Sequence, residues 1–218
     1  MLKVLRLKEG DTFPIIDKRG YKGKAIITSI INTSYLEFRI LELEGYNPEF
    51  PFHITLAQSL IKGKNMSILL KKATELGVSK IVPIISERTV VRKINVDRWK
   101  NIVKEASKQS LRLHIPYIED LKKFEEVIQF LKEYPVKIIL SPHSDLHIRE
   151  FLENTIFPYE IVFLSGPEGG FTKKEINLAK KYGFTDINLG KRILRAETAP
   201  LVFLSILEYK WGNVKSSI

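Results

Sequence analysis

The chain of 218 residues is 44% apolar and 28% charged, a composition typical of a folded globular protein that excludes a disordered or collagen-like chain. It has no cysteine, which excludes disulfides, a thiolate nucleophile and cysteine-ligated metal sites. Its formal net charge of +10 favours a polyanionic partner over a neutral or acidic small substrate.

No stretch of the sequence approaches the roughly 18 uncharged apolar residues that a membrane-spanning helix needs. Lys3, Arg6, Lys8 and Glu9 interrupt the first ten positions, where a secretion signal would be continuously apolar. We therefore expect a cytoplasmic protein with no membrane partner.

The first 64 residues predict short strands and turns. Apolar residues alternate with polar ones over 2–8 and 36–40, and a mostly apolar run spans 25–31, patterns typical of strands. A last strand is expected over 54–60, and the Lys-Gly-Lys-Asn sequence at 62–65 then predicts a hinge. Residues 1–64 are therefore expected to form a small β-barrel or curled sheet.

From residue 65 onward, helical periodicity alternates with short apolar runs. Helices are expected over 67–76, 97–113, 121–131, 148–153 and 172–182, strands over 81–85, 136–140, 161–164 and 186–189, and a closing helix from Pro200 to about Trp211. Such alternation predicts an α/β domain, with a mostly parallel sheet covered by helices on both faces.

Ligands of such sheets bind beyond the carboxyl ends of the strands, so the loops there are candidate sites. The first is the glycine-rich loop 165–171, which precedes a capping box formed by Thr172 and Glu175. Its glycines allow a close approach of backbone to ligand. It matches neither the dinucleotide nor the phosphate-loop motif, which argues against an ordinary nucleotide site.

Two further loops follow predicted strands. Loop 189–199 carries Arg195 and Glu197 on either side of one small residue, and a surface ion pair with a helix cap is the alternative reading of this pair. Loop 141–145 carries His143, but no nucleophile elbow accompanies it, so a hydrolase triad is not supported. His143 and His147 have no nearby third ligand, and we expect no metal site.

The segment 86–116 holds eight basic and three acidic residues, which is half of the net charge of the chain. A solvated helix face and an RNA phosphate site are both compatible with this pattern.

Several motifs together resemble the RsmE family, uridine-N3 methyltransferases of small-subunit ribosomal RNA. The most specific are Gly166–Phe171 (GPEGGF) and Ile193–Ala199 (ILRAETA), with Leu189-Gly190 between them. The resemblance continues in order through Val4–Asp11, Lys72–Val78, Pro83, Glu87-Arg88, Arg98-Trp99, Glu105-Ala106, Gln109-Ser110, Arg112 and Pro116. Family members usually have a basic strand ahead of Val4, so we expect a smaller contribution to RNA binding from that end.

The resemblance implies a SPOUT-type, trefoil-knotted domain over residues 65–218, preceded by a PUA-like β-barrel over 1–64. It implies S-adenosylmethionine as methyl donor, and ribosomal RNA, free or within the small subunit, as partner. It also implies a homodimer. The apolar closing helix would contribute to that interface through Leu201, Val202, Leu204, Ile206, Leu207 and Trp211, and packing within one subunit is the alternative reading of the same residues.

The loops and the resemblance together predict the site residues. Those expected around the cofactor are Leu140, Ser141, Pro142, Leu164, Ser165, Gly166, Pro167, Glu168, Gly170, Leu189, Gly190, Arg192, Ile193, Leu194 and Ala199. Arg195 is expected to donate to the uracil carbonyls or a phosphate, while Glu197 positions Arg195 or caps the last helix. The expected RNA contacts are Arg88, Arg92, Lys108, Gln109 and Arg112.

Two other functions fit parts of this pattern. A non-catalytic RNA-binding protein would have no need of the glycine-rich and Ile-Leu-Arg loops. A methyltransferase acting on transfer RNA or on large-subunit ribosomal RNA would keep every feature.

Overall fold

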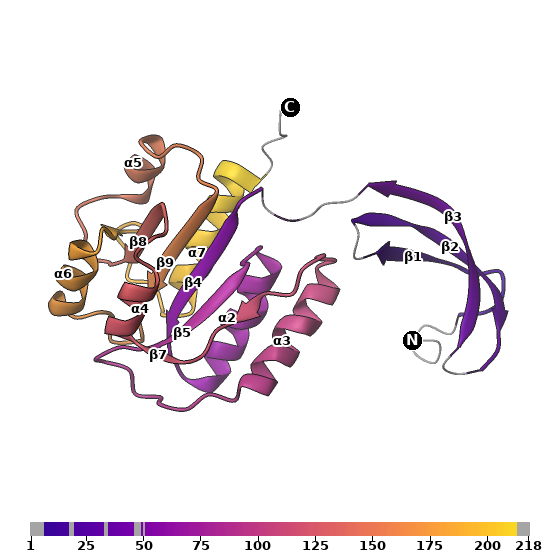
Figure 1. Ribbon diagram of the computed structural model, residues 1–218, viewed down its shortest axis with the longest axis horizontal. Coiled ribbons are helices and arrows are strands. Elements are labelled where there is room, and N and C mark those ends of the chain that lie inside the picture. The colour runs from indigo at the N-terminus through magenta and orange to yellow at the C-terminus, as the bar shows by residue number, and fades with distance from the viewer. Residues whose placement is uncertain (1–6, 18–19, 33–34, 46–48, 50, 213–218) are drawn as a thin grey trace. The chain divides into compact units, whose positions relative to one another are not determined.

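The computed structural model describes residues 7–17, 20–32, 35–45, 49 and 51–212. It forms two compact units (Figure 1). The N-terminal unit comprises residues 1–49 and 111–114, and the C-terminal unit comprises 50–110 and 115–218. Among the described helices, none combines the length and apolarity required to cross a bilayer.

The N-terminal unit contains a three-stranded antiparallel sheet in the order β1 (Thr12–Asp17), β2 (Tyr21–Ile30) and β3 (Leu36–Gly45). Ala25 and Ile27 of β2 are buried and belong to the apolar run from which this strand is predicted. The strands expected over 25–31 and 36–40 are thus confirmed. The strand expected over 2–8 lies almost entirely outside the described residues.

The C-terminal unit is built on a seven-stranded parallel sheet, with path order β10-β8-β9-β4-β5-β6 and β7 paired to β5. Its strands are β4 (His53–Ser59), β5 (Lys80–Ile85), β6 (Tyr117–Ile118), β7 (Lys122–Lys123), β8 (Val136–Leu140), β9 (Glu160–Ser165) and β10 (Thr185–Ile187). Its helices are α2 (Gly63–Glu75), α3 (Val96–Gln109), α4 (Phe124–Phe130), α5 (Ile148–Glu153), α6 (Lys173–Lys181) and α7 (Thr198–Leu207), followed by a π-helical turn, η1 (Glu208–Gly212).

The predicted domain boundary is wrong by about fifteen residues. Strand β4 was expected to close the N-terminal barrel, but it pairs in parallel with β5 and β9, and the two units divide between Glu49 and residue 50. All residues of β4 after His53 are buried, which is typical of a central strand in a parallel sheet covered on both faces. The predicted hinge at 62–65 is instead the start of α2.

Two helix boundaries also differ from prediction. Helix α3 ends at Gln109 rather than at residue 113, because Ser110 is its C-cap and Leu111 has a left-handed φ of 59°. Helix α4 begins at Phe124, three residues later than expected, after the short strand β7.

Side chains of β9 alternate between two apolar layers. Phe163 packs with α7, where its ring centroid lies 4.6 Å from that of Phe203, in a cluster that also contains residues of α2 and α3. Val162 and Leu164 point to the other cluster, with Val127 of α4 and Ala179 of α6. Helices therefore cover both faces of the sheet, as predicted (Figure 1).

The register brings four strand ends to one edge. Gln58 of β4 lies opposite Ser165 of β9, Leu164 opposite Ile139 of β8, and Leu140 of β8 opposite Ile187 of β10. The loops that leave these strands therefore start side by side.

Candidate functional site

A cavity of about 650 Å³ lies at this carboxyl edge, within the size range of small-molecule sites. All three predicted loops line it, and every residue expected around the cofactor lies in its wall except Leu164. Leu164 does not line the cavity, because its side chain is fully buried in the core beneath α4 and α6.

The glycine-rich loop makes a tight turn at the cavity wall. The Gly170 amide donates to the Pro167 carbonyl at 2.8 Å. A Cβ on Gly166 would lie 3.2 Å from backbone atoms of Gly170 and Phe171, so the turn leaves no room for a side chain there. The predicted capping box follows: the Thr172 hydroxyl and the Glu175 carboxylate each accept from the other residue's amide.

The loops after β8 and β10 are tied together. The Ser141 amide donates to the Ile187 carbonyl at 2.9 Å. The Asn188 side chain donates to the Ser144 carbonyl at 2.8 Å, and its oxygen accepts from the Gly190 amide at 3.0 Å. Gly190 has a φ of +117°, which disfavours any other residue. Asn188 was not predicted to matter, although its position directly after a strand was a usable signal.

Arg195 and Glu197 both line the cavity. Glu197 is the N-cap residue of α7 by position, but its side chain makes no capping hydrogen bond. Among the described ion pairs none joins Arg195 to Glu197, so neither expected role of Glu197 is seen. The Arg195 side chain is exposed and can donate to a ligand in the cavity.

Lys62 and Asn65, at the start of α2, also line the cavity and were missed. The Lys62 amide donates to the Glu168 carboxylate at 3.1 Å, which joins α2 to the glycine-rich loop. Both residues follow β4, so assigning β4 to the parallel sheet would have placed them at a strand end.

The charged residues of the cavity wall are mostly basic. Four cations, Lys62, Arg88, Arg192 and Arg195, face two carboxylates, Glu168 and Glu197. This excess of positive charge favours an anionic ligand at the mouth.

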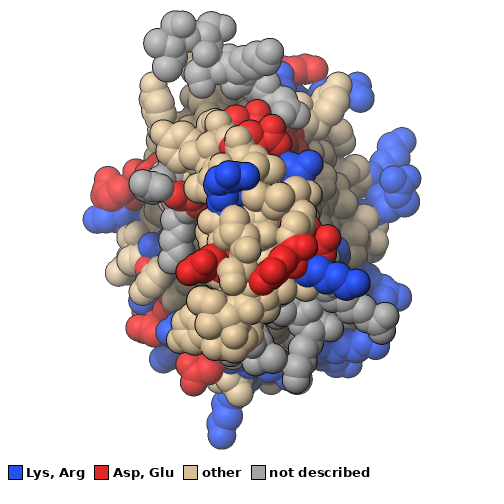
Figure 2. All heavy atoms as spheres, turned by 90° about the vertical axis from the view of Figure 1, so that its right-hand side faces the viewer, with Lys and Arg blue, Asp and Glu red and all other residues tan. Residues whose placement is uncertain are grey.

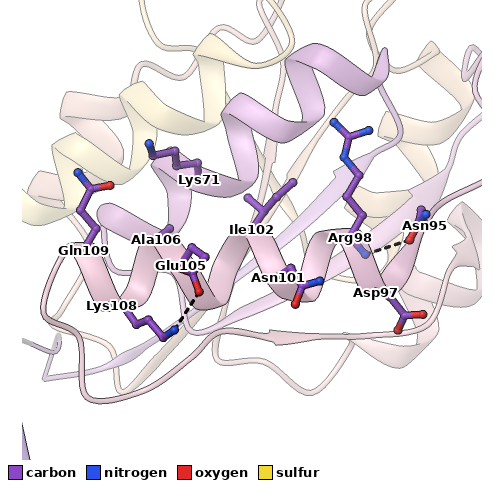
Figure 3. Close-up of a pocket in the computed structure, with 10 residues that line it drawn as sticks. All are labelled: Lys71, Asn95, Asp97, Arg98, Asn101, Ile102, Glu105, Ala106, Lys108 and Gln109. Carbon is purple, nitrogen blue, oxygen red and sulfur yellow. Dashed lines mark hydrogen bonds and ion pairs between the residues drawn. The ribbon is translucent and has the colours of Figure 1, made fainter. Parts of the chain in front are cut away.

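A second hollow lies between α2 and α3 (Figure 3). Lys108 and Gln109, both expected RNA contacts, line it with Lys71 and Arg98. Lys108 pairs with Glu105 at 2.9 Å, but both side chains are more than half exposed, and such a pair yields readily to a phosphate. Arg92 is exposed in the loop before α3.

Arg112 was expected to contact RNA, but its side chain is only 5% exposed and is paired with Glu49. The Glu49 carboxylate also accepts from the amides of Leu113 and His114. Burial raises the pKa of Glu49, and the Arg112 guanidinium with these two amides outweighs it, so the pKa lies below its usual value. Arg112 therefore holds segment 111–114 within the N-terminal unit.

On the face drawn in Figure 2, Lys and Arg side chains are interspersed with acidic and uncharged ones. Among the described residues, no group of three or more His, Asp or Glu side chains could hold a metal ion. His143 lines the cavity, and the His147 ring caps α5 by accepting from the Arg149 amide.

Residues 48–208 match the family model of an RNA methyltransferase domain, and residues 1–41 match that of an RNA methyltransferase PUA domain. The chain is 33% identical over 207 residues to the ribosomal RNA small subunit methyltransferase E of Synechocystis, covering 93% of this chain and 67% of that protein.

Two solved structures are similar over most of the chain. The methyltransferase E of Neisseria gonorrhoeae, bound to S-adenosyl methionine, has a TM-score of 0.82 at 35% identity and covers 98% of this chain and 89% of its own. A putative methyltransferase from Legionella pneumophila, also with this cofactor, has a TM-score of 0.79 at 31% identity, covering 95% and 86%. With its SPOUT-type fold, the chain belongs to the ribosomal RNA small subunit methyltransferase E family, as the resemblance in its motifs predicts.

Proposed function

We propose that this protein transfers a methyl group from S-adenosylmethionine to N3 of a uridine in small-subunit ribosomal RNA. The observation that carries the proposal is the single cavity in which the glycine-rich loop, the loop after β8 and the Ile-Leu-Arg loop meet. The relatives support it: the proteins of Synechocystis and Neisseria gonorrhoeae are ribosomal RNA small subunit methyltransferases E, and the structures from Neisseria gonorrhoeae and Legionella pneumophila contain bound S-adenosyl methionine.

The cavity fits the cofactor in size and in chemistry. Apolar walls from Leu140, Leu189 and Leu194 suit an adenine ring, and the glycines at 166 and 190 allow the ligand to approach the backbone closely. When bound there, S-adenosylmethionine supplies an activated methyl group on its sulfonium.

The protein must help uracil lose the N3 proton, because neutral N3 is a poor nucleophile. Arg195 is placed to donate hydrogen bonds to the carbonyl oxygens beside N3, which carry the negative charge once the proton leaves. Glu197 lies in the same wall and offers a carboxylate that can serve as proton acceptor or orient the base. Holding the two reactants in line supplies much of the remaining acceleration.

RNA would reach the cavity across cationic surface. Lys62, Arg88 and Arg192 line the cavity, and Arg92, Lys108 and Gln109 would extend the contact beyond it. This role suits phosphate recognition, since RNA helices are read largely through their backbone. With ribosomal RNA as substrate, the proposed place of action is the cytoplasm, where ribosomes assemble.

We further propose a homodimer that uses α7. Leu201, Val202 and Ile206 are only partly buried, and Tyr209 of the following turn is 93% exposed, which leaves an apolar stripe on one side of the helix. Three other residues expected at this interface, Leu204, Leu207 and Trp211, are buried in the core of one subunit instead.

Mass spectrometry of ribosomal RNA nucleosides tests the proposed reaction. RNA from cells lacking the gene should lack one 3-methyluridine in the small subunit, and purified protein with S-adenosylmethionine should restore it. Loss of a methylated nucleoside from transfer RNA or from the large subunit would identify a different substrate.

A further inference from the structure

The glycine-rich loop is held from outside by Arg88, a residue of the loop that follows β5. The Arg88 Nη1 donates to the Gly169 carbonyl at 2.7 Å, the length of a strong, charge-assisted hydrogen bond. The aliphatic stem of Arg88 also packs on Gly169, since a Cβ there would lie 3.2 Å from Arg88 Cδ and 3.4 Å from its Cβ.

The backbone that carries Arg88 is itself anchored. The Ser86 amide donates to the Thr89 hydroxyl at 2.9 Å. The Glu87 amide donates to the Glu175 carboxylate at 2.8 Å, and the Thr172 hydroxyl donates to Glu87 at 3.2 Å. The loop after β5 is thus fixed to the start of α6. The backbone that carries Arg88 is therefore held in place while its guanidinium bonds Gly169.

Other contacts hold the glycine-rich loop from the side of β4. The Gln58 side-chain amide donates to the Gly166 carbonyl at 3.3 Å, and Glu168 accepts from the Lys62 amide at 3.1 Å. With Arg88 on Gly169, the loop is held at three of its residues. Arg88 and Gly169 both line the cavity, so this contact lies where a cofactor would touch the loop.

We propose that Arg88 is a positioning residue for the cofactor loop: it holds the Gly169 carbonyl so that the turn 166–170 is formed before S-adenosylmethionine binds. This inference rests on the proposed function for the identity of the cofactor. It differs from the expectation that Arg88 serves only as a phosphate contact, because it makes cofactor affinity depend on Arg88 in the absence of RNA.

Titration calorimetry of S-adenosylmethionine into the purified full-length protein, without RNA, tests the proposal. Arg88→Ala should raise the Kd for the cofactor about tenfold, the effect of losing one hydrogen bond to a charged donor at a solvent-exposed position. Arg88→Lys should recover most of the affinity, because its ammonium can still donate to a carbonyl. Lys93→Ala, at an exposed lysine of the same loop outside the cavity wall, should leave the Kd unchanged.

A double-mutant cycle with Gly169→Ala separates positioning from direct contact. The added methyl group would press on the Arg88 stem, so Gly169→Ala should weaken cofactor binding in the parent and have little further effect in Arg88→Ala. Additive losses would show that the two residues act independently and would overturn the proposal.

Cofactor affinity equal to that of the parent in Arg88→Ala, with RNA affinity reduced, would also overturn it and leave Arg88 as a phosphate contact. Failure of the parent itself to bind the cofactor would instead refute the proposed function. If Arg88→Ala does not fold, Arg88→Lys and Gly169→Ala carry the test, with thermal unfolding of each variant showing that the fold persists.

Discussion

Substitution of Arg195 tests whether this side chain acts in methyl transfer or only in binding. Arg195→Lys keeps the positive charge but loses the planar fork that can bond two acceptors at once. We expect the single-turnover rate of methyl transfer to fall about tenfold to a hundredfold, with RNA and cofactor affinities close to those of the parent. The deficit should shrink as pH rises, because more uracil N3 is then deprotonated without help.

Arg192→Lys is the matched control for this measurement, since Arg192 is another exposed arginine of the same cavity wall. An Arg195→Lys variant that loses RNA affinity but keeps its rate at saturating RNA would identify Arg195 as a phosphate clamp.

The buried pair of Glu49 and Arg112 predicts a pH-dependent stability of the N-terminal unit. Glu49→Gln should lower its free energy of unfolding by about 3 kcal/mol at neutral pH, because it leaves a buried guanidinium without its carboxylate. The folded pKa of Glu49 lies below its usual value of 4.5. The ionised carboxylate therefore stabilises the fold fully above that value, and this stabilisation is lost as pH falls through the folded pKa.

Chemical denaturation of parent and variant at a series of pH values measures this effect. The difference in free energy of unfolding between parent and variant should be constant from pH 8 to about pH 5.5 and should become smaller below pH 4.5. A gap that widens on acidification would contradict the pairing.

At the level of loops and helices, the positive φ of Gly190 makes the loop after β10 sensitive to any side chain. Gly190→Ala should reduce affinity for S-adenosylmethionine at least tenfold, because its methyl group requires a strained backbone and projects into open space at the cavity wall. Gly183→Ala, with a similar positive φ of +82° outside the wall, should lower stability only. Ligand-induced shifts in Tm distinguish the two, and equal shifts would place the cofactor elsewhere.

Helix α3 and the loop before it supply the proposed RNA contact away from the cavity. Arg92→Glu combined with Lys108→Glu should weaken RNA binding and flatten its dependence on salt, because fewer phosphates are neutralised. Cofactor affinity should not change. Filter binding at several salt concentrations measures how steeply RNA affinity falls with salt. A dependence equal to that of the parent would show that this segment is a solvated face that does not contact RNA.

For the whole molecule, the apolar stripe on α7 predicts association. Val202→Glu should convert a dimer into a monomer in light scattering or sedimentation, because a buried charge without a partner opposes association. Phe130→Glu, on an exposed apolar residue of α4 on the other face of the sheet, should leave the oligomeric state unchanged. A parent protein that is already monomeric would refute the proposed interface.

The sequence alone determined the family, the α/β class and most of the cavity wall. The strands over 136–140 and 160–165 are short apolar runs between clear helices, and parallel strands place the loops that follow them at one edge. The glycine-rich loop therefore lies at this edge, and the strand order β10-β8-β9 brings the Ile-Leu-Arg loop, which follows β10, close to it. The trefoil knot stays a prediction, because local periodicity carries no information about how a chain is threaded.

Only the tertiary structure decided which strands pair and which side chains contact one another across the chain. A mostly apolar run such as 54–57 fits an edge of a barrel or the centre of a sheet, and its pairing with β5 and β9 shows that it is central. Arg112 and Arg88 look alike in a basic segment, yet one is buried against Glu49 and the other bonds Gly169. A basic residue in a sequence is expected to be solvated or to bind an anion. Which group it actually contacts depends on residues far away in the chain, which only the folded structure brings close.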